Sequence, residues 1–215
     1  MNVDTRYINQ IEVITSIFTI DKSKLKVYLV KRTSDPYKGY WMMPSNLLMT
    51  SETIMECADA TSEEFLGINN IKFIQCDVYS DIDRLPNDRI IGNSVIGLVD
   101  SETLRLRKKT TDYEGAWFNI DEIPKMVFDY EKILMGAFNF LSKHVHNPDL
   151  IKILYPSDFT LSELQALYEQ LLNKKLDRRN FRKKIFAMDI IEQTGYKTGN
   201  KIGRPAELYH FKEVE

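Results

Sequence analysis

Four glutamates lie in or just before one stretch of helical pattern between Trp41 and Ile68. They are Glu52, Glu56, Glu63 and Glu64. Carboxylates grouped in this way can do metal chemistry, because Mg²⁺ prefers oxygen ligands and usually takes one or two carboxylates together with substrate phosphates. A metal held like this activates water for hydrolysis. The arrangement of these glutamates on the helix therefore decides whether hydrolysis is expected.

Local signals set the ends of the helix that carries them. Ser51 is expected to be the N-cap, because its hydroxyl can accept a hydrogen bond from the first-turn amides. Gly67 is expected to close the helix, since glycine readily adopts the left-handed conformation that ends one. Fourteen residues of helical pattern precede this glycine.

One face of this helix carries too few acids for a metal site. Positions 61, 64 and 65 share a face because residues three and four apart are neighbours on a helix, and they read Thr, Glu and Phe. Glu64 alone is a poor anchor for Mg²⁺, and Phe65 makes the surroundings drier. Glu56 or Glu63 are alternative ligands, although both are explained more simply as solvated helix charges.

The stretch resembles the Nudix box, written G-x5-E-x7-R-E-U-x-E-E-x-G-U with U a bulky aliphatic residue. The positions that match are Glu52, Glu64, Gly67 and Ile68. Among the positions that depart from the pattern, Asn46 replaces its glycine, Ala60 its arginine, and Thr61 and Phe65 two of its glutamates. The resemblance implies a Nudix fold whose magnesium and diphosphate clamp has been lost. We therefore expect no catalytic residue, no metal site and no cofactor.

The resemblance extends along nearly the whole chain. VYLVKR followed by Pro36, Gly39 and Trp41 resembles the strand that leads into the Nudix box. DIDRLPNDR, WFNIDEIPKMVFDYEKIL and the ending GRPAELYHF are similar to Nudix-related transcription regulators of the NrtR-like group. The resemblance implies an α+β chain, with a Nudix α/β/α sandwich over residues 1–148 and a winged helix-turn-helix domain over 149–215.

Length and composition fit a soluble globular protein of one large or two small domains, with a basic end. The 215 residues are 43% hydrophobic and 28% charged, with a formal charge of −2. Residues 152–215 hold 12 Lys and Arg against 9 Asp and Glu, so a polyanion is an expected partner for this part alone. Cys57 and Cys76 form no disulfide framework. The first ten residues lack an apolar signal core and no run reaches membrane-spanning length, so we expect a cytoplasmic location and no membrane contact.

Periodicity predicts the elements of the first domain. Two alternating β-branched runs joined by Asp21–Lys24 indicate a β-hairpin. Further strands, an amphipathic helix and a boundary segment are expected downstream. The expected ranges are 11–20 and 25–31 for the hairpin, 71–79, 90–99 and 116–120 for strands, 128–145 for the helix and 144–156 for the boundary.

Thr160 and Glu163 predict a capping box that begins the first helix of a helix–turn–helix. Asp177 is expected to cap the second helix, whose apolar side holds Phe181 and Ile185. The opposite side is cationic, as a helix that reads the major groove requires, and a glycine-rich wing follows. The residues expected to bind DNA are Arg178, Arg179, Asn180, Arg182, Lys183, Lys184, Lys197, Lys201 and Arg204.

The first domain is expected to bind a small effector, because the regulators that this chain resembles sense ADP-ribose or a free sugar. Guanidinium groups match phosphate or vicinal hydroxyl oxygens, and indole rings stack on bases or sugars. The expected contacts are Arg32, Trp41, Glu52, Glu64, Asp83, Arg84, Arg89 and Trp117. In the competing interpretation both tryptophans belong to the core, and the arginines at 84 and 89 pair with nearby aspartates at the surface. The uncharged residues at 60 and 61 favour a sugar or sugar phosphate.

Three functions remain open from the sequence. The first is a homodimeric DNA-binding regulator, most simply a repressor, whose Nudix-like domain senses a sugar, sugar phosphate or ADP-ribose without hydrolysing it. The second is a divergent hydrolase of ADP-ribose or a nucleotide sugar that uses Glu64 with Glu56 or Glu52. The third is a binding scaffold whose winged helix contacts protein. The cationic helix face and the wing favour the first.

Overall fold

The larger domain is built around one long strand, β1 (Gln10–Asp21), whose residues from Glu12 to Ile20 are all buried. A continuous apolar and β-branched run predicts such a strand, buried on both faces. It pairs in parallel with β6 (Ile90–Leu98) on one side and antiparallel with β2 (Lys24–Lys31) and β4 (Ser45–Leu47) on the other. The computed structural model describes residues 10–86, 88–106, 111–155, 157–199 and 205–212.

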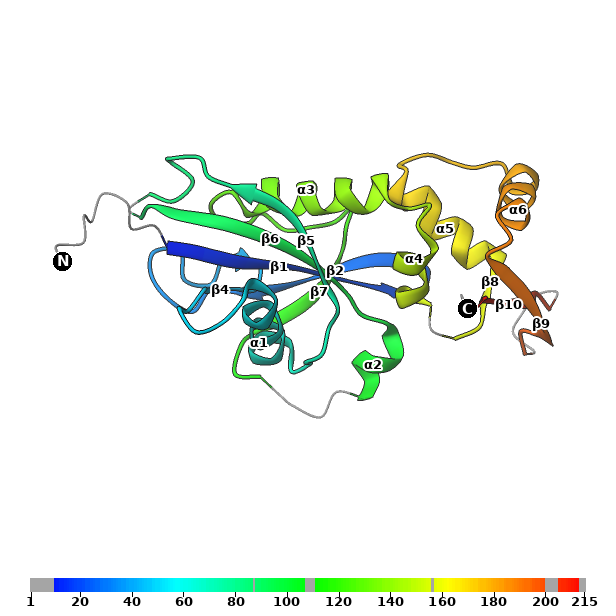
Figure 1. The fold of residues 1–215 in the computed structure, drawn as a ribbon, viewed down its shortest axis with the longest axis horizontal. Coiled ribbons are helices and arrows are strands. Elements are labelled where there is room, and N and C mark those ends of the chain that lie inside the picture. The colour runs from blue at the N-terminus through cyan, green and yellow to red at the C-terminus, as the bar shows by residue number, and fades with distance from the viewer. Residues whose placement is uncertain (1–9, 87, 107–110, 156, 200–204, 213–215) are drawn as a thin grey trace.

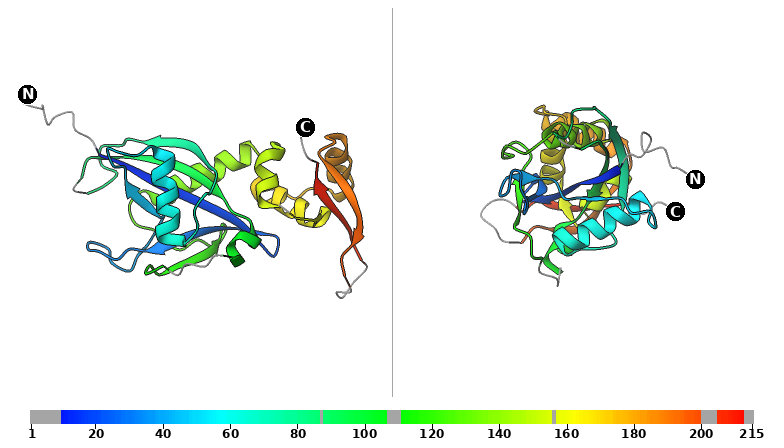
Figure 2. Two further views of the ribbon diagram at one scale, coloured as in Figure 1. Left: turned by 60° about the horizontal axis from the view of Figure 1, so that its bottom comes forward. Right: turned by 90° about the vertical axis from the view of Figure 1, so that its left-hand side faces the viewer.

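The sheet runs in the order β3–β2–β1–β6–β5, with β4 on β1 and β7 on β2. The remaining strands of this sheet are β3 (Trp41–Met42), β5 (Phe73–Tyr79) and β7 (Gly115–Asn119). Helices α1 (Ile54–Leu66) and α3 (Tyr130–Lys143) cover opposite faces of the sheet, as Figures 1 and 2 show. The α/β/α sandwich expected from the sequence is confirmed.

The hairpin of β1 and β2 is also confirmed. Its two central residues, Lys22 and Ser23, have φ of 51° and 63°, the positive values that a tight turn matched to the twist of the strands requires. Asp21 and Lys26 form an ion pair of 2.7 Å beside the turn.

The expected N-cap of α1 is wrong by two residues. Thr53 caps the helix, with its hydroxyl accepting a hydrogen bond from Glu56 N at 3.3 Å. The Glu56 carboxylate accepts in return from Thr53 N at 2.8 Å, and a threonine–glutamate pair at this spacing satisfies two backbone donors at once. Ser51 has isoleucine three residues on and cannot form this pair. The end of the helix at Gly67 is confirmed, with φ of 76°.

Two short helices were not expected. One is α2 (Ser101–Leu106). The other, α4 (Pro148–Leu154), lies in the segment expected to be an irregular boundary, and it buries Leu150, Ile151 and Leu154. Asn147 caps α4 and proline occupies its first turn, where no backbone donor is needed. Helix α3 begins at Tyr130 and ends at Lys143, shorter at each end than expected, because Phe128 is in the left-handed region with φ of 53°.

The smaller domain is a winged helix. It contains β8 (Phe159–Thr160), α5 (Leu161–Leu171), α6 (Arg178–Ala187), β9 (Ile191–Lys197) and β10 (Glu207–Phe211). The three strands pair in the order β8–β10–β9. Both expected caps are confirmed: Thr160 and Glu163 form a capping box, and Asp177 accepts a hydrogen bond from Asn180 N at 2.8 Å. The pattern predicts that this second helix runs from Arg178 to Ile191, but α6 ends at Ala187.

One apolar core runs through both domains. It extends from Ile14 in the sheet through Leu150 in α4 to Leu167 and Phe181 in the winged helix. The winged helix is therefore packed against the sandwich rather than joined to it by a free linker, as Figure 1 shows. Within the described ranges, every helix is too short or too polar to span a lipid bilayer.

Glu169 fixes the turn between α5 and α6. Its carboxylate accepts hydrogen bonds from Leu176 N at 3.0 Å, Gln165 Nε2 at 2.9 Å and Lys175 Nζ at 3.0 Å. These bonds, the backbone one above all, lower the pKa of Glu169 from its usual 4.5 to about 2. The ionised carboxylate therefore stabilises the turn at neutral pH.

We expect Glu169→Gln to lower the melting temperature of the chain at pH 7, as measured by circular dichroism. Because the folded-state pKa is depressed, the stabilisation is present above 4.5 and is lost as the pH falls through about 2. The difference between variant and wild type should shrink over this interval. Glu131→Gln, in the first turn of α3, is the matched control. Equal melting temperatures for Glu169→Gln and wild type at pH 7 would contradict the assignment.

Candidate functional site

The face of α1 that would hold a metal in the Nudix pattern is closed by core packing. Thr61 and Phe65, which replace two of the box glutamates, are 0% and 6% exposed. The Thr61 hydroxyl donates to Cys57 O at 2.7 Å, and the Phe65 ring lies 4.2 Å from the ring of Tyr113. Both positions therefore contribute to the interior of the domain.

The one remaining glutamate on this face already has partners. Glu64 accepts hydrogen bonds from Asn46 Nδ2 at 2.8 Å and from the Tyr113 hydroxyl at 2.6 Å, one on each carboxylate oxygen. The bond to Glu64 raises the pKa of Tyr113. The box position that usually holds glycine thus supplies, as Asn46, an amide that binds the carboxylate.

The other acids near the helix cap backbone groups. Glu52 accepts from Met49 N at 2.8 Å, and Glu56 belongs to the capping box with Thr53. In the part of the chain that the structure describes, no group of three or more His, Cys, Asp or Glu side chains is placed to hold a metal ion. The donor set around α1 does not fit a magnesium–diphosphate clamp.

A cavity of about 320 Å³ opens next to β4, at the end of the sheet where β1 begins. It lies between β4, the segment before β6 and the start of α3. Its size is in the range of pockets that hold small molecules, and its walls combine aromatic and polar groups. The lining residues used below are Glu12, Arg32, Ser45, Asn46, Phe128 and Tyr130.

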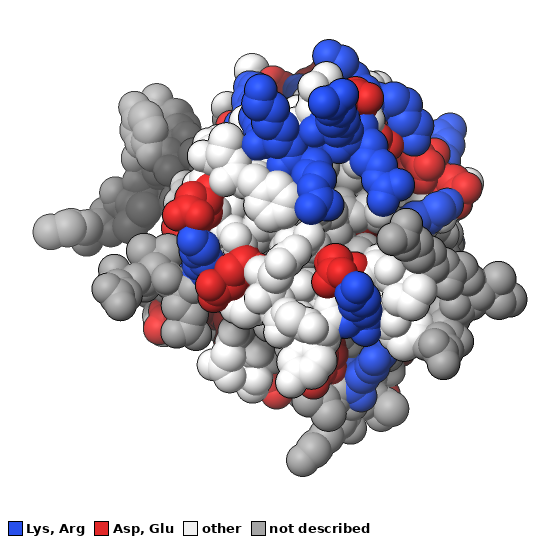
Figure 3. All heavy atoms as spheres, turned by 90° about the vertical axis from the view of Figure 1, so that its right-hand side faces the viewer, with Lys and Arg blue, Asp and Glu red and all other residues white. Residues whose placement is uncertain are grey.

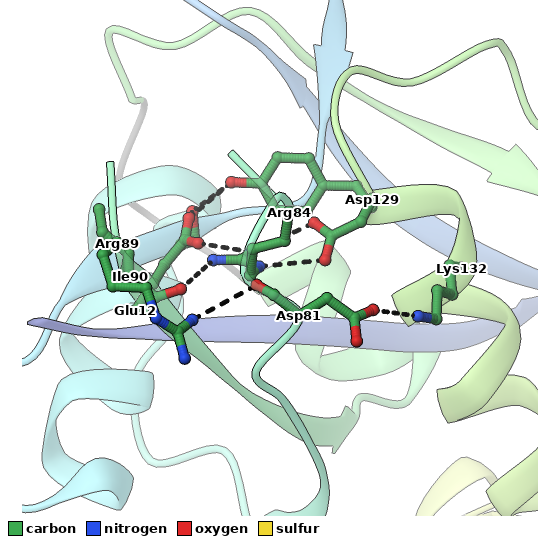
Figure 4. Close-up of polar contacts among 9 residues, drawn as sticks. Glu12, Asp81, Arg84, Arg89, Ile90, Asp129 and Lys132 are labelled. Atoms are coloured by element: carbon green, nitrogen blue, oxygen red, sulfur yellow. Dashed lines mark hydrogen bonds and ion pairs between the residues drawn. The ribbon is translucent and has the colours of Figure 1, made fainter. Parts of the chain in front are cut away.

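Arg84 lies behind the carboxylate of Glu12 and lines a neighbouring open cleft instead of this cavity (Figure 4). Its side chain is 1% exposed, and it donates to Asp129 at 3.0 and 3.2 Å, to Glu12 at 3.0 Å and to Ile90 O at 3.3 Å. Gly92 on β6 leaves room for it, because a Cβ there would lie 3.2 Å from the guanidinium carbon. Arg84 therefore joins β1, β6 and the start of α3 through charge-assisted hydrogen bonds.

Glu12 is held by three donors and faces the cavity. One oxygen accepts from Ser45 Oγ at 2.7 Å and from the Tyr130 hydroxyl at 2.6 Å, while the other accepts from Arg84. Burial first, and then the neighbouring carboxylate, raise the pKa of Tyr130 well above its usual range, so this hydroxyl stays a donor. The result is a fixed polar floor below an open cavity.

The expected effector residues do not all meet at this cavity. Arg32 lines it, with Nε donating to Pro36 O at 2.8 Å and its guanidinium 5.5 Å from the Phe128 ring. Arg84 reaches it only through Glu12. Asp83 lies at a neighbouring open cleft with Lys132.

The other residues expected to contact the effector do not line this cavity. Arg89 is exposed and donates to Asp81 O at 3.3 Å, whereas the sequence suggested side-chain pairing with aspartates for both arginines. Trp41 packs edge-on against Phe118 at 4.8 Å, and Trp117 lies 5.2 Å from Tyr28. Both tryptophans are half-buried in ring contacts.

Three residues of the cavity floor were missed from the sequence. They are Glu12, Ser45 and Tyr130. A carboxylate in the run IEVITSIFTI was the available signal, because an acid inside an otherwise buried strand requires a partner. Nothing local identifies that partner, since Arg84 lies 72 residues further along.

A second candidate surface lies on α6. The helix carries five basic residues and no acid, and all five are exposed while Phe181 and Ile185 are buried. Figure 3 shows Lys and Arg side chains gathered on one part of the face at this end of the molecule. The expected residues on this surface are Arg178, Arg179, Asn180, Arg182, Lys183 and Lys184.

Two of these cations have close neighbours. The Arg182 guanidinium lies 5.0 Å from the Phe186 ring, and Lys184 Nζ lies 3.2 Å from His146 Nε2. On the wing, Lys197 forms an ion pair of 2.8 Å with Glu207. The expected wing residues Lys201 and Arg204 lie outside the described residues.

Residues 153–211 match the family model of the NrtR DNA-binding winged helix domain. The chain is 27% identical over 201 residues to the ADPR responsive transcriptional repressor NtrR of Acinetobacter baylyi, an alignment that covers 91% of this chain and 79% of the relative. It is also 31% identical over 110 residues to the ADP-ribose pyrophosphatase of Methanocaldococcus jannaschii, covering 51% of this chain and 63% of that enzyme.

Among solved structures, the chain matches Shewanella oneidensis NrtR complexed with a 27mer DNA, with a TM-score of 0.78, 23% identity and coverage of 94% and 93% of the two chains. The separate NUDIX domain of that protein, crystallised with ADP ribose, matches with a TM-score of 0.54 and 17% identity, covering 65% of this chain and 94% of that domain. The expected fold, a Nudix sandwich followed by a winged helix, is confirmed, as is the resemblance to the NrtR-like group.

We expect Arg84→Met to lower the free energy of unfolding by about 3–5 kcal/mol, because it leaves the carboxylates of Glu12 and Asp129 buried without their cation. Urea denaturation at pH 7 measures this. Arg89→Met, five residues away and exposed, is the control and should change stability by no more than about 0.5 kcal/mol. Similar losses in both variants would show that the buried network is not what stabilises the floor of the cavity.

Proposed function

We propose that this chain is a DNA-binding transcription regulator, acting as a homodimeric repressor in the cytoplasm, whose Nudix-like domain binds a small effector without hydrolysing it. The observation that carries the proposal is the wholly basic, exposed face of α6 in a winged helix that matches the NrtR DNA-binding model. Because phosphate contacts dominate affinity for DNA, such a face suits an operator better than a protein partner.

In this proposal α6 enters the major groove. Arg178 and Arg182 read guanine edges or bind phosphate, and Asn180 pairs with an adenine edge, the contacts that these side chains make best. Lys183, Lys184 and the wing residues Lys197, Lys201 and Arg204 add phosphate contacts. Two copies related by a two-fold axis present two helices to half-sites about one helical turn apart. The A. baylyi relative is named as a repressor, which supports the same direction of control.

The Nudix-like domain is proposed to have lost hydrolysis because its acids are committed to other partners. Glu64, Glu52 and Glu56 all accept hydrogen bonds from the chain itself, and the positions of two further box glutamates are buried. A carboxylate that must give up two donors before it can bind Mg²⁺ is a weak ligand. Hydrolysis remains the second candidate, favoured by the 31% identity to an ADP-ribose pyrophosphatase over half of the chain.

The effector is proposed to bind in the cavity above Glu12. Arg32 supplies a cation at its rim, while Asn46 and Ser45 supply groups for hydroxyl oxygens. The neighbouring open cleft that contains Asp83 shares Pro86 and Phe128 with this cavity. A molecule with two polar ends joined by a linker, such as ADP-ribose, can therefore lie across both, whereas a sugar or sugar phosphate fills the first. The name of the A. baylyi relative supports ADP-ribose.

We expect the double variant Arg178→Ala, Arg182→Ala to bind the DNA upstream of the gene more weakly, by at least about tenfold per residue at physiological salt. The slope of binding against salt should also fall by about one for each phosphate that the variant no longer touches. Fluorescence anisotropy measures both quantities.

Lys132→Ala is the control for that experiment, because Lys132 is an exposed lysine of the other domain that pairs with Asp81. It should bind DNA like the wild type. If the double variant bound as tightly as this control, α6 would not be the recognition helix.

We expect ADP-ribose, a sugar or a sugar phosphate to raise the melting temperature, since a ligand that prefers the native state stabilises it. Incubation of ADP-ribose with the protein and Mg²⁺ or Mn²⁺ should release no AMP above the level in buffer. Release that depends on metal and disappears in Glu64→Gln would instead establish the hydrolase. Arg32→Ala should reduce the thermal shift while leaving the unliganded melting temperature nearly unchanged.

A further inference from the structure

One side chain of the winged helix forms two hydrogen bonds to the backbone of the sensor domain. Gln170 of α5 accepts a hydrogen bond from Leu25 N at 2.8 Å through Oε1 and donates to Ser23 O at 2.7 Å through Nε2. A third bond, from Nε2 to Ala166 O at 3.1 Å, fixes the amide to its own helix. The amide therefore binds a donor and an acceptor of the β1–β2 hairpin in one orientation.

The hairpin that Gln170 binds is formed by β1 and β2, and the same two strands position residues that line the cavity above Glu12. Glu12 is near the start of β1 and Arg32 follows the end of β2, while Ser23 is in the turn between the strands. At about 3.3 Å per residue, β1 extends roughly 30 Å from Glu12 to the turn. In Figure 1 the turn end of this hairpin lies beside the winged helix domain. A shift of either strand at the cavity is therefore carried to the turn.

On the other side of the contact, Gln170 is close to the turn that positions α6. Its neighbour Glu169 binds Leu176 N, and Asp177 then caps α6. The hairpin, α5, the turn and the recognition helix are thus connected by hydrogen bonds at each step. Apolar packing between the domains is not directional, whereas the paired bonds of an amide permit one geometry.

The domain junction also has room to move. A cavity of about 500 Å³ lies beside Gln170, between α3 and α5, with Met135 and Phe138 on one wall and Ala166 on the other. Close-packed interiors resist rearrangement, so an opening here allows α5 to change its position without a clash. The hydrogen bonds of Gln170, which fix the orientation of α5, therefore lie next to a cavity that allows α5 a different orientation.

We propose that Gln170 is the coupling residue through which the sensor domain sets the position of the recognition helix, an inference that rests on the proposed function. Occupation of the cavity shifts β1 and β2, the hairpin turn moves with them, and the amide of Gln170 transfers this movement to α5 and α6. Coupling between sites in proteins is commonly about 5- to 150-fold in affinity.

The test compares the full-length wild type with Gln170→Leu and with Gln193→Leu as the matched control. Gln193 is a glutamine of β9 whose amide donates to the Tyr209 hydroxyl at 3.3 Å, within the winged helix and away from the α5–α6 turn. Binding to the upstream DNA is measured with and without ADP-ribose, and thermal scans confirm that each variant folds. We expect the ratio of the two dissociation constants to fall to about one in Gln170→Leu only. A ratio in Gln170→Leu equal to that of the wild type overturns the inference.

A second measurement needs neither DNA nor effector. Residual dipolar couplings report the orientation of the winged helix relative to the sandwich, and we expect one orientation in the wild type and a spread in Gln170→Leu. If the wild type fails to bind DNA, or responds to none of ADP-ribose, a sugar and a sugar phosphate, the proposed function fails, and this measurement alone decides the coupling role. Identical couplings in wild type and Gln170→Leu then overturn it.

Discussion

A buried guanidinium between two carboxylates holds three segments of the larger domain together. Arg84 is nearly inaccessible, and the groups that surround it come from the first strand, the sixth strand and the residue that precedes α3. Such an arrangement is costly to break because each unpaired charge would be left out of water. It also fixes the position of Glu12, and with it the Ser45 and Tyr130 hydroxyls below the cavity. The network supplies a fixed floor in which two carboxylates share one guanidinium.

The acidic residues of α1, the helix that carries the Nudix-like box, also have to find partners. In a hydrolase, several acids repel one another until a divalent cation joins them. Here, two of those positions are core residues, and the one acid that is left accepts from an amide and a phenol of the same chain. The remaining carboxylate of this face is therefore satisfied by hydrogen bonds from within the chain. Lys and Arg side chains gather instead on α6, and Figure 3 shows the face on which they lie.

Local rules predicted much of this structure from the sequence, and long-range partners account for the rest. Gly67, the Thr160–Glu163 box and Asp177 were placed correctly because each acts within four residues of itself. The expected cap Ser51 failed against Thr53 because only the latter has a glutamate three residues on. The burial of Arg84 could not be predicted, since its acceptors Glu12 and Asp129 lie 72 and 45 residues away. The effector and DNA contacts remain predictions.

The parallel pairing of β1 with β6 affects how the nascent chain folds during translation. The register joins residues 10 and 90, so about 80 residues must leave the ribosome before the central strand meets its partner. At roughly 5–20 residues per second, the wait lasts several seconds. Throughout it, the most apolar segment of the protein has an open edge, which is a template for aggregation. The early hairpin with β2 covers the other edge, and it is the part of the sandwich that can protect the nascent polypeptide first.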